Sequence, residues 1–243
     1  MSTTTTVFMA PQRYARAGGG LYLALIALGL FAEISRNSMI VSGDAAGTAA
    51  RIVAGEPLWR AAIAAEFLTI VCALTLAMIY YVLLRPVSRE LTILATFLRM
   101  VSLTVQTVAV FFLLAALYPL GAAPYLKAFT AEQQQVLARL AIRAHADGYG
   151  VALLVLGFCF LVHGYLIFTS TFLPRVLGLL IQLAGLSYLA NSFALVLAPA
   201  IASRLFPLIL LPAFVGELSL SLWLLVKGVD AGKWRALAPA PQP

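Results

Sequence analysis

Three ionisable side chains lie in stretches of this sequence that are otherwise almost free of charge: Arg99, His163 and Glu217. In hydrocarbon such groups cost about 2.5–3.5 kcal/mol each on insertion scales, so they face the interior of a bundle and pair with something. At the rise of a helix, Arg99 lies about 12 Å and Glu217 about 15 Å from the inner ends of their helices, and His163 lies at a similar depth. The sequence therefore predicts an ion pair between Arg99 and Glu217, with His163 nearby.

This predicted inner cluster allows two interpretations. An interhelical ion pair offsets the burial of both charges, so it can simply hold two helices together while His163 bonds a backbone carbonyl. The same three groups are also those expected of a gate for protons or for a small solute. The residue types alone leave both interpretations open.

A second polar constellation is expected nearer the outer side of the membrane. The first helix carries a glutamate, an arginine and an asparagine at i, i+3 and i+4, so they share one face, and the second helix carries a glutamate about 9 Å inside its outer end. A histidine and a tyrosine four residues apart stand at the mouth of this region, and a later helix adds a polar stripe. Together they predict a polar cavity that opens outward, with the candidate residues Glu33, Arg36, Asn37, Glu66, His145, Tyr149, Asn191 and Ser192.

A metal ion is only weakly indicated by this pattern. Glu33, Glu66 and His145 are suitable ligand types, but the sequence lacks the short-spaced pairs, such as His-x-x-x-His, that make a zinc site specific. If one unbroken helix carried both histidines, His145 and His163 would lie about 27 Å apart and could not share an ion. No firm metal site and no cofactor follow from the sequence.

The elements that must position these groups are membrane-spanning helices. The chain has 243 residues, of which 63% are hydrophobic and 10% charged. A soluble globular chain has about 45–50% apolar residues, so both a soluble domain and intrinsic disorder are excluded. Since about 20 apolar residues cross a bilayer, the sequence predicts an all-α integral membrane bundle of six helices. Their expected ranges are 19–37, 61–84, 91–120, 150–170, 174–197 and 205–227.

The connecting segments carry further signals. Residues 130–146 begin with a capping box and have one charged face, which predicts an amphipathic helix along the outer membrane surface before a turn inward at Gly148 and Gly150. Asp44 is expected to cap a short helix, and Pro212 is expected to kink the sixth helix. We expect residues 1–18 to be a cytoplasmic segment, 19–228 the membrane domain and 229–243 a flexible cytoplasmic tail.

Charge placement suggests the orientation of the chain. The net charge is +7, and basic residues lie close to the helix ends at the short connections, where the positive-inside rule acts. This favours both termini in the cytoplasm and a position in the cell inner membrane. The basic residues then suit anionic lipids of the bilayer, and no basic-aromatic patch indicates nucleic acid. The oligomeric state does not follow from the sequence.

Six stretches of the chain resemble a bacterial multi-pass membrane family, "domain of unknown function 4386", over about Arg13 to Gly228. They are YARAGGGLYL from Tyr14, SGDAAGTAARI from Ser42, YVLLRPVSREL from Tyr81, HADGYG from His145, GYLIFTSTFLPRVLG from Gly164 and LPAFVGELSLSLWLLVKG from Leu211. The resemblance implies the fold and carries no activity, cofactor or catalytic residue.

Three classes of function fit these observations. The polar clusters and the expected kink favour a transporter or small-solute-binding protein, although no inverted repeat is visible. A non-catalytic membrane partner or sensor would use the polar clusters only for helix packing. An intramembrane enzyme, with Glu33, Glu66 and His145 as base and metal ligands, ranks lowest because the sequence has only two histidines and no nucleophile motif.

Overall fold

The protein is an all-helical bundle in the computed structural model, which describes residues 11–205 and 207–237. Among these residues, six helical segments are long and apolar enough to cross a membrane, as the sequence predicts. The elements are α2 (Pro11–Met39), α3 (Ala45–Ala54), α4 (Glu56–Leu84), α5 (Arg89–Ala115), the 3₁₀ turn η1 (Pro124–Ala128), α6 (Ala131–Thr169), α7 (Arg175–Leu197), α8 (Pro199–Leu205), the 3₁₀ turn η2 (Leu208–Leu210), α9 (Leu211–Val226) and α10 (Ala231–Leu237).

Local sequence signals fix where several helices begin. Asp44 accepts a hydrogen bond from the backbone N–H of Gly47 at 2.8 Å, so it caps α3 as predicted. Thr130 and Gln133 form the expected capping box at the start of α6. Ser88 accepts from the N–H of Leu91 and caps α5 directly after the short α4–α5 connection.

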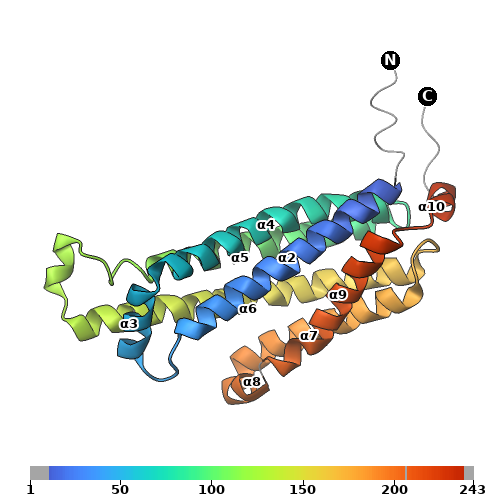
Figure 1. Ribbon diagram of the computed structural model, residues 1–243. Coiled ribbons are helices and arrows are strands. Elements are labelled where there is room, and N and C mark those ends of the chain that lie inside the picture. Colours follow the sequence, from blue (N-terminus) through green and yellow to red (C-terminus); the bar gives the residue numbers. More distant parts are fainter. Residues whose placement is uncertain (1–10, 206, 238–243) are drawn as a thin grey trace.

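The spanning helices alternate in direction, so the start of α2 and the helix α10 lie at the same end of the bundle, while α3 and α8 lie at the other end (Figure 1). The long helix α6 packs against α5 and α7, and α2 packs against α4 and α9. Large apolar side chains such as Phe97, 68% exposed, cover the outside. An apolar surface of this extent suits a lipid environment.

Glycines allow α6 and α7 to approach closely. A Cβ built on Gly164 would lie 2.7 Å from the carbonyl oxygen of Gly178, and one built on Gly185 would lie 2.7 Å from that of Gly157. Both distances are too short for a real side chain. Because the two glycines of each helix are seven residues apart, they face each other along one seam, as small residues do in membrane helix pairs.

The helix α6 differs from the predicted arrangement. The amphipathic segment 130–146 is helical, but it continues without a break to Thr169, so no surface helix turns inward at Gly148 and Gly150. The two glycines serve helix packing: a Cβ on Gly148 would lie 3.1 Å from Ala109, and one on Gly150 would lie 2.5 Å from Leu195. The short amphipathic helix that stands by itself at this end is α3.

The sixth spanning segment also differs from its prediction. Pro212 lies in the first turn of α9, where a proline is tolerated because that N–H has no helical partner. It therefore starts the α-helix and does not kink it. The residues before it form the separate helix α8 and the turn η2.

The segment after Gly228 is more ordered than the predicted tail. Residues Ala231–Leu237 form α10, and the indole N–H of Trp234 donates to the carbonyl of Leu83 at 2.9 Å. Gly228 has a φ of +70° and a Cβ there would meet Gln12, whose amide bonds Lys227 and Val229. The predicted N-terminal segment 1–10 and the last tail residues, 238–243, lie outside the described residues.

Candidate functional site

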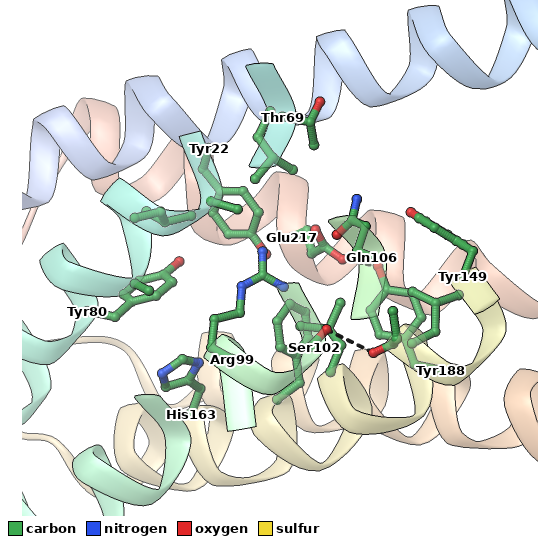
Figure 2. Close-up of a pocket in the computed structure, with 18 residues that line it drawn as sticks. Tyr22, Thr69, Tyr80, Arg99, Ser102, Gln106, Tyr149, His163, Tyr188 and Glu217 are labelled. Atoms are coloured by element: carbon green, nitrogen blue, oxygen red, sulfur yellow. Dashed lines mark hydrogen bonds between the residues drawn. The ribbon is translucent and has the colours of Figure 1, made fainter. Parts of the chain in front are cut away.

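A polar cavity of about 80 Å³ lies in the middle of the bundle, between the six spanning helices (Figure 2). Arg99 lies about 15 Å along α5 from its first residue, and Glu217 lies about 14 Å before the end of α9, at the same end of the bundle. The helical rise thus places the two residues at a similar level. The polar residues that line the cavity are Tyr22, Thr69, Tyr80, Arg99, Ser102, Gln106, Tyr149, His163, Tyr188 and Glu217.

The helix α5 presents Arg99, Ser102 and Gln106 to the cavity because the spacing i, i+3, i+7 places them on one face. The Ser102 hydroxyl donates to the carbonyl of Ala152 on α6 at 2.9 Å, which ties this face to the neighbouring helix. Figure 2 shows the Arg99 side chain extending toward Tyr22 and Glu217.

Glu217 is held by tyrosines. The hydroxyl of Tyr188 on α7 donates a hydrogen bond to Oε1 of Glu217 on α9, and Tyr22 approaches the same carboxylate from α2. Glu217 is only 9% exposed. A buried carboxylate needs such donors, because an unpaired one is costly.

Arg99 and Glu217 line one cavity without touching directly. Among the described residues, Arg99 has neither an ion pair nor a hydrogen-bond partner. The predicted direct contact is therefore absent, because the tyrosine hydroxyls of Tyr22 and Tyr188 occupy the surroundings of the carboxylate. The guanidinium faces the cavity instead.

His163 lines the same cavity as Arg99 and Glu217. It is buried and lines the cavity, with its ring 5.1 Å from the ring of Tyr80. Its Nδ1 lies 3.6 Å from the sulfur of Cys159, which donates to the carbonyl of Ala95. The cysteine is thus a buried packing residue, as its place in a span suggests.

Two hydroxyls at the cavity have no hydrogen-bond partner within the described part of the chain: those of Thr69 and Tyr80. Both side chains come from α4, and both residues are at least nine-tenths buried, with exposures of 7% and 9%. A buried hydroxyl without a partner costs about 1–3 kcal/mol. A guest in the cavity would recover part of that cost.

The predicted outer residues of α2 and α4 form an ion-pair network centred on Arg36. Arg36 bonds Glu33 on its own helix and lies 3.1 Å from Oε1 of Glu66 on α4. Asn37 donates to Glu33 at 2.7 Å. Gln106 on α5 lies near Glu66 and also lines the cavity, so the outer network adjoins the inner cluster.

Of the remaining outer candidate residues, only one lines the central cavity. Tyr149 lines the central cavity, whereas His145 is buried beside it with Nδ1 3.0 Å from the carbonyl of Ala109. The Nε2 of His145 has no partner among the described residues. Ser192 donates to the carbonyl of Gly150 and, like Asn191, lies outside the set that lines the cavity.

The candidate metal ligands do not converge. Among the described residues, no three His, Cys, Asp or Glu side chains are placed to hold an ion together. Glu33 and Glu66 both face the guanidinium of Arg36, which already supplies the positive charge that a cation would bring.

Sequence reasoning missed most of the cavity lining. The residue patterns do not predict Tyr22, Thr69, Tyr80, Gln106 or Tyr188 as lining residues. A usable signal exists for α5, since Gln106 follows Arg99 at a helical spacing inside an apolar run. Tyrosines in mid-span are another signal, because in membrane proteins they concentrate at the interfaces.

Comparison with known proteins gives one match. Residues 17–228 match the family described as Domain of unknown function (DUF4386). No curated protein and no solved structure shows a significant match to the sequence. The predicted resemblance is confirmed, and the description states no activity.

Proposed function

Since the chain belongs to this family and is a multi-pass membrane protein, we propose that it binds a small polar solute in the central cavity, either to carry it across the membrane or to sense it. The observation that carries the proposal is a polar cavity at mid-membrane depth whose arginine, Arg99, is left without a protein partner among the described residues. A bundle that needed Arg99 and Glu217 only for packing would pair them directly.

The polar residues on the outer side of the cavity suggest a route by which the solute enters. Tyr149 and Gln106 line the cavity, and both lie near Glu66 of the outer network. In this proposal a solute enters from the outer side past Tyr149 and Gln106. The network is a static contact between α2 and α4 at that entrance.

We also propose that both termini are cytoplasmic and that the protein lies in the cell inner membrane. In support, the connections at the end that carries the start of α2 are short, and Arg85, Arg89, Arg175 and Lys233 all lie there. Reporter fusions at Pro174 and Ala123 test this orientation. A fusion at Pro174 that is active only outside the cell would invert it.

Thermal unfolding of the full chain in mild detergent tests solute binding. A ligand of the folded state at a hundredfold excess over its Kd stabilises by about 2.7 kcal/mol. We expect at least one small polar solute to raise the Tm, and Arg99→Gln to abolish the rise. Arg143→Gln is the matched control, because Arg143 pairs with Asp147 on the exposed face of α6.

Equal responses of the Arg99 and Arg143 variants would overturn the cavity as the binding site. If no solute raises the Tm of the unaltered chain, the cavity is a packing feature and the protein acts through partners. The structure favours binding over that alternative because Thr69, Tyr80 and Arg99 present unused donors to one space.

A further inference from the structure

The central cavity contains hydrogen-bond donors that no protein group uses among the described residues. Arg99 alone carries five N–H donors in a planar fork, and it has no partner among the described residues. The hydroxyls of Thr69 and Tyr80 are buried and also lack partners within the described chain. All three residues line one space. A guest that satisfies them must bring acceptors.

The one carboxylate that lines the cavity does not meet this need. Glu217 already accepts from Tyr188, and Tyr22 lies at the same group. The carboxylate nearest on the outer side, Glu66, faces Arg36 and Gln106. The acceptors that Arg99 lacks are therefore not supplied by the described protein groups around it.

We infer that the cavity binds a small planar oxyanion of the carboxylate type, held by the guanidinium fork of Arg99 and by the hydroxyl of Tyr80. This inference rests on the proposed function and names the class of its solute. Arginine is suited to the role because its fork matches the two oxygens of a carboxylate. The hydroxyl of Tyr80 on α4, which has no partner among the described residues, then adds a further donor.

The size of the cavity narrows the class. Its volume is about 80 Å³, roughly half that of an engineered cavity of about 150 Å³ that holds benzene. The space thus suits an anion of three or four heavy atoms, such as formate or acetate. An aromatic acid or a sugar acid would require the helices to separate.

Charge balance adds a consequence. Arg99 and Glu217 together are neutral when both are ionised, so a bound anion adds one negative charge at membrane depth, which is costly. A proton taken from solvent by Glu217 would remove that charge, and anion binding would then be stronger at lower pH. The groups around Glu217 are Tyr22 on α2, Tyr80 on α4, Arg99 on α5, Tyr149 and His163 on α6 and Tyr188 on α7.

The test uses the full chain in lipid nanodiscs with sodium acetate, with acetamide as the neutral molecule of the same shape and sodium chloride as the salt control. We expect acetate to raise the Tm by about 5 °C or more near saturation, with little effect of acetamide or chloride. Arg99→Lys keeps the charge but loses the fork, and we expect it to weaken acetate binding roughly tenfold. Arg143→Lys should bind like the unaltered protein.

The outcomes separate the two proposals. If acetamide stabilises as well as acetate, or if carboxylates fail while another small solute acts through Arg99, the anion class is wrong and solute binding stands. If neither acetate nor any other small solute raises the Tm, both proposals fail. Binding of acetate that is unchanged in Arg99→Lys and in Tyr80→Phe would place the anion outside this cavity and overturn the inference.

Discussion

Tyr188 on α7 donates its hydroxyl hydrogen to the carboxylate of Glu217 on α9, so the hydrogen bond joins two helices at the cavity. It gives the carboxylate a neutral partner and leaves the guanidinium of Arg99 facing open space. The proposed binding site depends on this separation of Arg99 from Glu217.

Replacing Tyr188 by Phe removes that donor and little else. We expect a loss of about 0.5–2 kcal/mol in the free energy of unfolding, since interhelical hydrogen bonds in membranes are of that size. We also expect weaker acetate binding, because the freed carboxylate can turn to Arg99. Thermal unfolding with and without acetate measures both effects.

The control for this change is Tyr165→Phe, which alters a tyrosine that is 50% exposed on α6. It should leave stability and binding unchanged. Stronger acetate binding in Tyr188→Phe would show that the tyrosine hydroxyl competes with the anion and does not hold the carboxylate away from Arg99.

Glu217→Gln tests the charge balance of the cavity. The neutral amide removes the negative charge that a bound anion must otherwise tolerate, so we expect acetate to bind roughly tenfold or more tightly. The unaltered protein should bind acetate better at pH 6 than at about pH 8, whereas the variant should show no such dependence. Titration calorimetry at the two pH values measures this. Glu132→Gln, on the exposed first turn of α6, is the control.

An identical pH dependence in the Glu217→Gln and Glu132→Gln variants would assign the proton to another group. Weaker binding of acetate by Glu217→Gln would show that the carboxylate helps to hold the ligand. A cationic or zwitterionic solute would then replace the anion.

How much of this site the sequence predicts depends on the residue type. Charged residues are rare in an apolar run, so Arg99 and Glu217 stand out and their common level follows from helix geometry. Tyrosines carry no charge, so they stand out less within an apolar run. The roles of Tyr22, Tyr80 and Tyr188 depend on which faces of three distant helices meet, and that information is not local.

The fold follows from the sequence where burial in lipid dominates. Apolar runs predict the spanning helices, and capping residues such as Asp44 and Thr130 predict their starts. The length of α6 does not follow, because Gly148 and Gly150 have the local signature of a break. Their actual role, close contact with α5 and α7, is set by neighbours far along the chain.

The glycine seam between α6 and α7 gives a test of packing. A Cβ at Gly178 would lie 2.5 Å from the backbone nitrogen of Phe168 and 2.6 Å from the carbonyl oxygen of Gly164. We expect Gly178→Ala to lower the free energy of unfolding by about 1–3 kcal/mol, as overpacking does. Gly29 has nothing within 4 Å of its Cβ position. Gly29→Ala should therefore be neutral or stabilising by up to about 1 kcal/mol. Equal Tm values for the two variants would contradict the seam.

The ion-pair network between α2 and α4 gives a test of burial. Arg36 and Glu66 have side chains only 9% and 7% exposed, so Arg36→Gln leaves a buried carboxylate without its cation. We expect a loss of about 3–5 kcal/mol in the free energy of unfolding. Arg60→Gln breaks the exposed pair with Glu56 and should cost at most about 1 kcal/mol. Denaturation in detergent compares them. A similar small loss in both variants would mean that Arg36 is hydrated in the membrane.

The attachment of α10 to the bundle should depend on pH through Asp230. The backbone N–H of Lys233 donates to this carboxylate at 3.1 Å, and that bond, the nearby ammonium of Lys233 and the N–H of Gly232 lower the pKa of Asp230 below its ordinary value. A lowered pKa in the folded state means that the contribution to stability is present above the ordinary pKa of about 4 and is lost as the pH falls through the lower, folded-state value. We therefore expect acid to loosen the start of α10, where Trp234 bonds Leu83. Hydrogen exchange of residues 231–237 should accelerate below about pH 4 relative to the intrinsic rate. The control is Asp230→Asn, which keeps a hydrogen-bond acceptor at every pH. The amides of α10 should stay protected from exchange in this variant. If acid loosens α10 to the same extent there, the effect belongs to other carboxylates.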